Sequence, residues 1–86
     1  MDKNRQKLED ICKLLEIFIR GDNRSLEFAG QIGVVLDDFS ADELLNDYRV
    51  SLAMYCPGGG EFLYDEEQMT SQLKTLKYEL ELRLKN

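Results

Sequence analysis

Apolar side chains recur every third or fourth residue in four separate stretches of this chain, and this period constrains the fold more than any other feature. The spacing places the apolar residues of each stretch on one side of an α-helix. It predicts helices at about residues 4–20, 26–38, 41–55 and 66–84. Four helices that each carry one apolar face can bury those faces against one another. The sequence therefore predicts an all-α fold, a small antiparallel four-helix bundle.

Residues with strong preferences for helix ends mark the boundaries of these stretches. Gly21 follows the first one, at a position where a left-handed conformation commonly ends a helix. The segment Ser40-Ala41-Asp42-Glu43 has the spacing of a capping box, and Asp65 with Gln68 forms a second one. Pro57 disfavours a helical residue before it. These signals predict that the third helix is capped by Ser40 and ends before the glycine-rich segment that follows Pro57.

Two glycines, Gly30 and Gly33, share one face of the second predicted helix. Each weakens a helix by up to about 1 kcal/mol relative to Ala. They either let another helix approach closely or are simply tolerated in a short helix, and the sequence leaves both interpretations open.

Length and composition indicate one soluble domain. The chain has 86 residues, of which 43% are apolar or aromatic and 33% are charged. A domain of this size buries only about 60–65% of its unfolded surface, which leaves room for a core and one binding face rather than a deep active site. No export signal precedes the first helix, and no apolar stretch reaches the roughly 18–20 residues that span a bilayer. We expect a single cytoplasmic domain over residues 1–86.

The chain lacks the residue patterns of catalysis and of metal binding. It contains no histidine, and none of its serines lies in a G-x-S-x-G sequence. The paired carboxylates lack the alternating spacing of a calcium loop, and Gly58-Gly59-Gly60 is followed by acidic residues that would repel a phosphate. Cys12 is predicted to be a small buried hydrophobic residue, and Cys56 to be inert. We expect no enzyme activity, no cofactor and no metal.

Charge is distributed unevenly along the chain, whose formal net charge is −6. Between residues 21 and 67 there are eleven acidic side chains and only two basic ones, Arg24 and Arg49. Nucleic acid is a poor partner for such a surface, because a phosphate backbone is met by clustered Lys and Arg. Some acids are explained by helix capping, which favours them by about 0.3–1 kcal/mol in a first turn. Capping does not explain the scarcity of basic residues, so a basic protein partner is favoured.

The layout of the chain resembles that of a known family. The features that carry the resemblance are Phe18-Ile19-Arg20-Gly21 at the end of the first helix, Ser25 to Phe28 at the start of the second, the acidic middle, Pro57, Tyr64, and Asp65-Glu66 at the start of the last helix. From about Ile11 to Leu80 this arrangement is similar to the colicin D immunity family and related contact-dependent-inhibition immunity proteins. These are small acidic helical proteins that protect bacteria from their own nuclease toxins.

The resemblance implies that the protein binds a cognate toxin whose active-site groove is basic because it accepts tRNA. The acidic surface would stand in for the phosphate backbone, in a complex of one monomer with one toxin domain. The implied partner-binding residues are Asp37, Asp38, Asp42, Asp47, Glu61, Asp65 and Glu66, with Tyr64 as an aromatic anchor.

Two other interpretations remain open at this point. The segment from Pro57 to Tyr64 is similar to a loop of the immunity proteins of DNase-type colicins, although their Tyr-Tyr-Pro sequence is missing. Alternatively, the apolar stripe from Met69 to Leu84 could pair with a second copy in a homodimeric adaptor protein.

We expect the purified protein to be monomeric, because four amphipathic helices can satisfy one another within one chain. Sedimentation equilibrium checks this prediction through the mass in solution. A mass of two chains at low micromolar concentration would favour the homodimeric adaptor instead.

Overall fold

Four α-helices make up most of the computed structural model, which describes residues 3–39 and 41–85. They are α1 (Lys3–Arg20), α2 (Leu26–Asp37), α3 (Glu43–Ala53) and α4 (Glu66–Lys85). Within the described ranges there is no β-strand, only two isolated β-bridges in the segment between α3 and α4. The predicted all-α four-helix bundle is confirmed.

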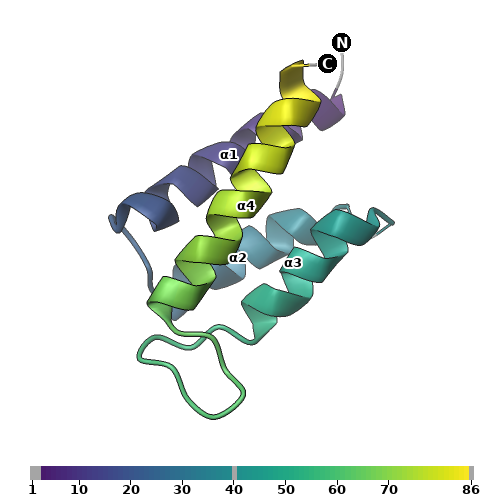
Figure 1. Ribbon diagram of the computed structural model, residues 1–86. Coiled ribbons are helices and arrows are strands. Elements are labelled where there is room, and N and C mark those ends of the chain that lie inside the picture. Colours follow the sequence, from purple (N-terminus) through teal and green to yellow (C-terminus); the bar gives the residue numbers. More distant parts are fainter. Residues whose placement is uncertain (1–2, 40, 86) are drawn as a thin grey trace.

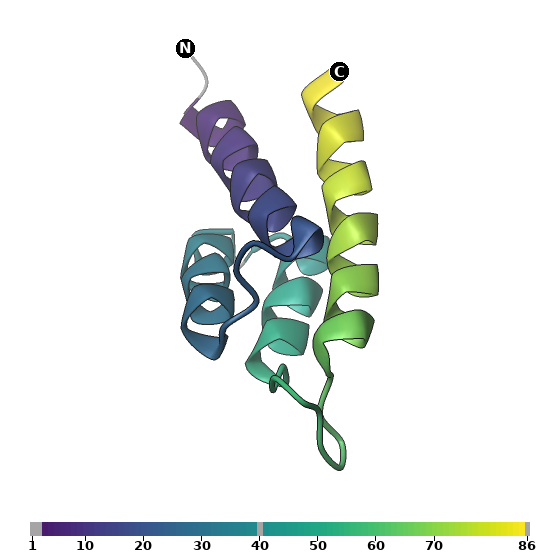
Figure 2. The ribbon, with the colours of Figure 1, turned by 90° about the vertical axis from the view of Figure 1, so that its left-hand side faces the viewer.

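The helices are arranged as two antiparallel pairs (Figure 1). The long helices α1 and α4 lie side by side, while the shorter α2 and α3 pair with each other and lie across the lower half of the first pair. In the view turned by 90°, α1 and α4 diverge toward the start of α1 and the end of α4 (Figure 2). The segment between α3 and α4 projects from the opposite end of the molecule.

One hydrophobic core joins all four helices. Its buried side chains are Ile11, Leu15, Phe18, Phe28, Ala29, Ile32, Leu36, Leu45, Leu52, Tyr55, Met69, Leu73, Leu76 and Leu80. On α4 the buried residues recur at three- and four-residue intervals, as the sequence pattern predicts for one face of a helix. The apolar face of this helix is therefore covered by the chain itself.

Local hydrogen bonds set several helix ends where the sequence places them. Gly21 has φ +84° at the end of α1, the left-handed conformation that glycine adopts without steric cost. At the start of α4 the Asp65 Oδ1 accepts from the Gln68 amide at 2.8 Å, while the Gln68 Oε1 accepts from the Asp65 amide at 3.0 Å. This reciprocal pair confirms the second capping box.

The start of α3 differs from the prediction. Its N-cap is Asp42, whose Oδ1 accepts a hydrogen bond from the Leu45 amide at 3.2 Å, so the helix begins at Glu43. The predicted cap, Ser40, lies outside the described residues. Both residues are favourable caps, but the Asp42 carboxylate also bonds to Arg83 on α4, a tertiary contact that a local pattern does not contain.

The end of α3 also comes earlier than predicted, at Ala53 instead of residue 55. Backbone hydrogen bonds pull the following residues toward the start of α4: the Cys56 amide donates to the Tyr64 carbonyl at 2.9 Å, and the Tyr64 amide donates to the Met54 carbonyl at 3.0 Å. Tyr55 leaves the helix in this way but keeps its ring in the core, only 2% exposed. Tyr48, which lies on the same helix, is half-buried against the core.

Replacing Leu76 with Ala tests the buried face of α4. The side chain is fully buried, so Leu76→Ala should lower the free energy of unfolding by about 2–5 kcal/mol. The control is Leu82→Ala on the same helix, where the side chain is 38% exposed and the loss should be about 1 kcal/mol or less. Urea unfolding followed by circular dichroism measures both, and equal losses would contradict this packing of α4.

Candidate interaction surface

The eight residues predicted to contact a partner are separated along the molecule rather than gathered on one face. Asp37, Asp38 and Asp42 lie around the turn between α2 and α3, whereas Glu61, Tyr64, Asp65 and Glu66 lie at the other end of α3. Asp47 lies on α3 between the two groups. The eleven residues of α3 extend over about 16 Å. The predicted residues therefore form two distinct acidic regions, which we call the turn end and the loop end.

At the turn end, Asp42 holds the bundle together. Its Oδ2 accepts from the Arg83 Nη1 at 2.7 Å, which joins the start of α3 to the last turns of α4. The hydrogen bond from Arg83 is the largest cause that lowers the pKa of Asp42 below its usual range. Because the same carboxylate also caps α3, Asp42 has a structural role that is independent of any partner.

Asp37 and Asp38 are also paired, but more loosely. The Arg49 Nε lies 3.6 Å from the Asp37 carboxylate, and the Lys7 Nζ lies 3.7 Å from that of Asp38. Both aspartates expose more than half of their side chains, so water and salt screen these pairs. Such pairs are weak enough to exchange for contacts with a partner.

Asp47 and Glu61 are the most available of the predicted acids. Both are exposed, and neither takes part in an ion pair within residues 3–39 and 41–85. Their charges face solvent without a counterion among those residues, so they can attract a basic surface.

The loop end is an ordered turn that three glycines make possible. Gly58 and Gly59 have φ +87° and +79°, and Gly60 has φ +158°. The Gly58 amide donates to the Glu66 Oε1 at 2.8 Å, and this hydrogen bond is the largest cause that lowers the pKa of Glu66. The Glu66 carboxylate therefore already accepts the hydrogen bond of the Gly58 amide that a bound phosphate would need. The same hydrogen bond joins the loop to the first turn of α4.

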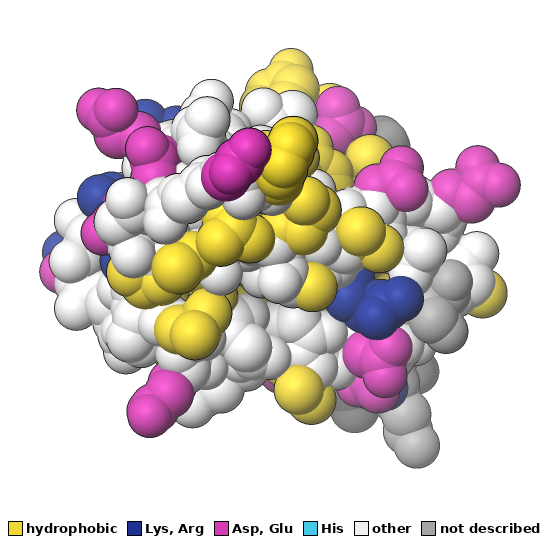
Figure 3. Space-filling view, turned by 90° about the horizontal axis from the view of Figure 1, so that it is seen from below, with side chains coloured by type: hydrophobic (Ala, Val, Ile, Leu, Met, Phe, Trp, Pro, Cys, Tyr) yellow, Lys and Arg dark blue, Asp and Glu magenta, His cyan; other side chains and the backbone are white. Residues whose placement is uncertain are grey.

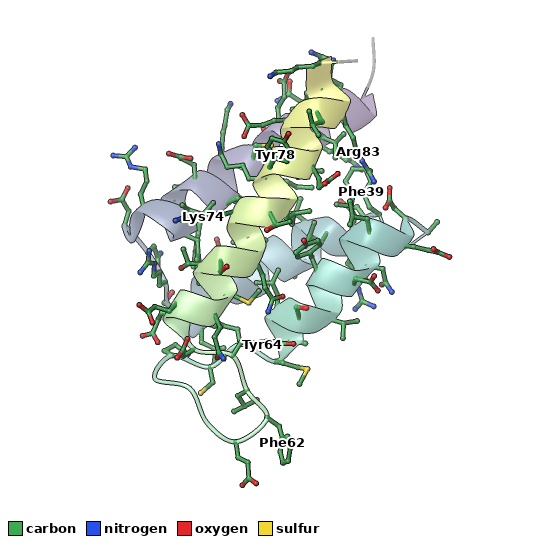
Figure 4. All side chains as sticks on the ribbon, in the orientation of Figure 1. Phe39, Phe62, Tyr64, Lys74, Tyr78 and Arg83 are labelled. Atoms are coloured by element: carbon green, nitrogen blue, oxygen red, sulfur yellow. The ribbon has the colours of Figure 1, made fainter. Side chains whose placement is uncertain are left out.

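Phe62 is the most exposed large hydrophobic side chain of the loop. It is 83% exposed and has φ +64°, a left-handed conformation that is unusual for an aromatic residue. Figure 4 shows the ring at the tip of the loop, pointing away from the helices, while Tyr64 lies closer to the bundle. Sequence reasoning selected Tyr64, which is half-buried, and missed Phe62. The sequence did contain a sign that Phe62 is exposed. This phenylalanine lies outside the apolar stripes of the predicted helices, two residues after a run of glycines.

Other apolar side chains accompany Phe62. Leu63 is 40% exposed and Met54 is 37% exposed. In the space-filling view from below, hydrophobic side chains gather across this end of the molecule with acidic side chains around them (Figure 3). An apolar patch with a charged rim is the usual composition of a protein-binding surface.

The two cysteines differ in position, because Cys12 lies on α1 and Cys56 lies at the base of the loop, where its amide bonds to the Tyr64 carbonyl. Cys12 is half-buried against the core, and burial is the largest cause that raises the pKa of its thiol. Cys56 lies beyond the end of α3, not at a helix terminus, with its Sγ 3.7 Å from the Pro57 carbonyl oxygen.

Within the described ranges, no three or more acidic or cysteine side chains are grouped so that they could hold a metal ion. A helix of the length and hydropathy needed to cross a membrane is likewise missing from the described residues.

No protein-family model, curated protein or solved structure matches this chain. The similarity to immunity proteins thus rests on the layout of residues alone, and the functional conclusion depends on the surface of the molecule.

The ion pair between Asp42 and Arg83 predicts how stability depends on pH. Asp42→Asn keeps a capping side chain but removes the charge that Arg83 binds. In the wild type, the lowered pKa of Asp42 contributes stability above the pKa of unfolded Asp, about 3.9, and this contribution is lost as the pH falls through the folded-state pKa. Asp42→Asn should therefore lower the free energy of unfolding by up to about 1 kcal/mol at neutral pH, and by almost nothing near pH 2.

Urea unfolding at the two pH values measures this difference. The control is Asp47→Asn. Asp47 lies on the same helix but takes part in no ion pair within residues 3–39 and 41–85. If Asp42→Asn lowers the free energy of unfolding equally at both pH values, the charge of Asp42 does not stabilise the fold.

Proposed function

We propose that this protein neutralises a basic partner protein by binding it at the loop end, and that the partner is a nuclease toxin. The observation that carries the proposal is Phe62, an exposed aromatic ring on a loop that is held in place by hydrogen bonds. Nothing in the packing of the bundle requires this ring to face solvent.

The backbone of Phe62 supports a role in binding. A bulky residue in a sparsely populated conformation costs about 1–3 kcal/mol, and such residues concentrate at functional sites. The backbone at the base of the loop is held in advance, because Tyr55 and Tyr64 form a β-bridge there. Binding of a partner over Phe62 therefore costs little conformational entropy for ordering the loop backbone. Aromatic side chains of this kind are common hot spots in protein interfaces.

The charges around the ring favour a basic partner. Glu61 precedes Phe62, and Glu67 is exposed in the first turn of α4. The α4 N-terminus at this end carries Glu66 and Glu67 but no basic residue in its first turn. A negative surface of this kind speeds association with a positive one, most strongly at low salt.

The resemblance to immunity proteins suggests which basic partner is meant. A ribonuclease that accepts tRNA needs a positive groove for the phosphate backbone. In this proposal the acidic loop end covers that groove in the cytoplasm, as one monomer on one toxin domain. A DNase toxin has a groove of similar charge and is the second candidate, which an activity assay on DNA distinguishes from the first.

The burial of the α4 stripe supports a monomer over the homodimeric adaptor. Met69, Leu73, Leu76 and Leu80 are fully buried in the core, so the face that such a dimer would use is already covered. The apolar residues that α4 does expose are Tyr78 and Leu82, one turn apart and outside this stripe.

Replacing Phe62 tests the proposed anchor. The probe is the partner nuclease domain, to be sought as a basic C-terminal domain in a neighbouring reading frame or by co-purification, and the measurements are surface plasmon resonance and inhibition of tRNA cleavage. Phe62→Ala should weaken binding by about thirtyfold or more, chiefly through faster dissociation. The control is Tyr78→Ala on α4, which removes another exposed ring and should leave affinity unchanged. Equal affinity of the two variants would refute a role for Phe62.

The charge of the loop is tested separately. Asp42 and Asp65 are poor choices for charge reversal, because both cap helices. Glu61→Lys changes an exposed loop residue and should slow association about tenfold at low salt, with a smaller effect at high salt. Asp10→Lys reverses an exposed acid on α1 and is the matched control. If both reversals slow association equally, only the net charge matters and the loop is not the contact.

A further inference from the structure

A polar groove lies between α3 and α4, two helices that are neighbours in both ribbon views (Figures 1 and 2). Its volume is about 350 Å³. Most of the side chains that line it carry oxygen atoms. They are Leu44, Asp47, Tyr48 and Ser51 on α3, and Ser71, Gln72 and Thr75 on α4. An occupant of this groove therefore contacts two helices at once.

The groove carries a negative charge that the chain does not neutralise. Asp47 is the one charged side chain among those that line it. Within residues 3–39 and 41–85, Asp47 takes part in no ion pair. The groove between α2 and α3 differs in this respect, because its charged side chains, Asp37 and Arg49, pair with each other.

A second carboxylate adds to the negative potential near this groove. Burial is the largest cause that raises the pKa of the Tyr48 hydroxyl, and the charges of Glu79 and Asp47 raise it further. Glu79 belongs to α4 and Asp47 to α3, so both helices place negative charge near Tyr48. The complement of this groove is therefore a cation.

Neutral hydrogen-bond acceptors accompany the carboxylate. The side chains of Ser51, Ser71 and Gln72 make no hydrogen bond to another residue of the described ranges. The Thr75 Oγ1 donates to the Ser71 carbonyl at 3.4 Å, which leaves its oxygen able to accept. The ring of Tyr48 is half-buried and adds an aromatic surface. A cation with several donors and a flat face can use all of these groups.

An arginine guanidinium has these properties, whereas a lysine ammonium does not. The guanidinium presents five donors in one plane and stacks on aromatic rings, while the ammonium is a compact and strongly hydrated charge with three donors. The chain itself joins α4 to α3 in this way at the turn end, where Arg83 donates to both carboxylate oxygens of Asp42, at 2.7 and 3.4 Å. Asp47 is a carboxylate of the same helix without such an arginine.

The arginine has to come from another molecule. All five arginines of this chain lie within the described residues, and none of them lines the groove. Each has a contact elsewhere: Arg5 with Glu9, Arg20 with Asp22, Arg24 with the Phe18 and Ile19 carbonyls, Arg49 with Asp37, and Arg83 with Asp42.

A partner that binds the loop end can also reach this groove. Met54 bonds to Tyr64 at the base of the loop. Asp47 lies about 10 Å from Met54 along α3, at a rise of about 1.5 Å per residue. An interface of ordinary size covers about 800 Å² of each protein, which is wide enough to include both places.

We propose that the groove between α3 and α4 binds the guanidinium of an arginine side chain of a partner protein. Asp47 supplies the carboxylate, the side chains of Ser51, Ser71 and Gln72 supply neutral acceptors, and the Tyr48 ring packs against the guanidinium plane. This site goes beyond the loop-end contact proposed above, and it does not depend on the partner being a toxin.

The test uses a small probe in place of the unidentified partner. The probe is N-acetyl-arginine methylamide, which presents arginine as it occurs within a protein chain, titrated into the ¹⁵N-labelled protein and followed by NMR. We expect saturable shifts of the backbone amides of Asp47, Ser51 and Thr75 and of the side-chain amide of Gln72. The matching citrulline compound has nearly the same shape without the charge and should give no saturable shifts. The matching lysine compound should bind about threefold more weakly or worse.

Two variants of equal charge change separate the groove from the net charge of the protein. Asp47→Asn keeps the shape of the side chain and should weaken probe binding about threefold or more, as expected for an exposed ion pair. Asp10→Asn removes an exposed acid from α1 and should bind the probe as the wild type does. Phe62→Ala should also leave probe binding unchanged, so the groove and the loop end succeed or fail independently.

Several results would overturn the proposal. Equal weakening by Asp47→Asn and Asp10→Asn would show that only net charge attracts the probe. Equal binding of the citrulline or the lysine compound would rule out recognition of a guanidinium. Loss of probe binding in Phe62→Ala would place the probe at the loop end instead. Tighter binding of free arginine, whose own carboxylate Asp47 should repel, would show that the occupant is a small molecule and not a protein side chain.

Discussion

The side chain and carbonyl of Arg24 join the end of α1 to the segment that follows α3. Its guanidinium donates to the Phe18 and Ile19 carbonyls at 2.8 and 2.7 Å, which satisfies backbone acceptors that the end of α1 leaves without helical partners. The same group lies 6.0 Å from the centroid of the Phe18 ring. The Arg24 carbonyl in turn accepts from the buried Tyr55 hydroxyl, and the Tyr55 ring meets Phe18 edge-on at 5.3 Å. One residue thus joins the end of α1 to the segment that leaves α3.

The position of the loop end depends on this cluster. Tyr55 is fixed on one side by Phe18 and Arg24, and on the other it bridges to Tyr64 across the base of the loop. The glycines then turn the chain so that Phe62 projects into solvent. A loop of ten or so residues would usually be mobile and would lose entropy on binding. Here its base is connected to the core through Tyr55 and Tyr64, so the backbone of the loop is already ordered below the exposed ring.

The acidic residues divide into those that make contacts within the fold and those that make none within the described ranges. Asp42, Asp65 and Glu66 accept hydrogen bonds from backbone amides at helix ends or in the loop, so the fold itself requires them. Asp47 and Glu61 make no such contact within the described ranges, and their charge is available to a partner. Helix capping therefore explains some members of the acidic tract, whereas partner binding remains the proposed role of the others. Charge counts alone cannot make this division, because it depends on where each carboxylate points.

The sequence by itself determined the features that depend on neighbours within about four residues. The helical period placed the four helices, and Asp65 with Gln68 identified the start of α4, because these interactions are complete within one or two turns. Tertiary structure decided the features that join distant segments. The cap of α3 moved to Asp42 because Arg83, 41 residues away, binds the same carboxylate. Phe62 is exposed because the loop that carries it projects from a base anchored at Tyr55 and Tyr64. Gly30 and Gly33 line an open groove because the packing of α1 and α4 covers one side of the α2–α3 pair and leaves the other uncovered. No local pattern contains that information, since which face is covered depends on where the rest of the chain lies.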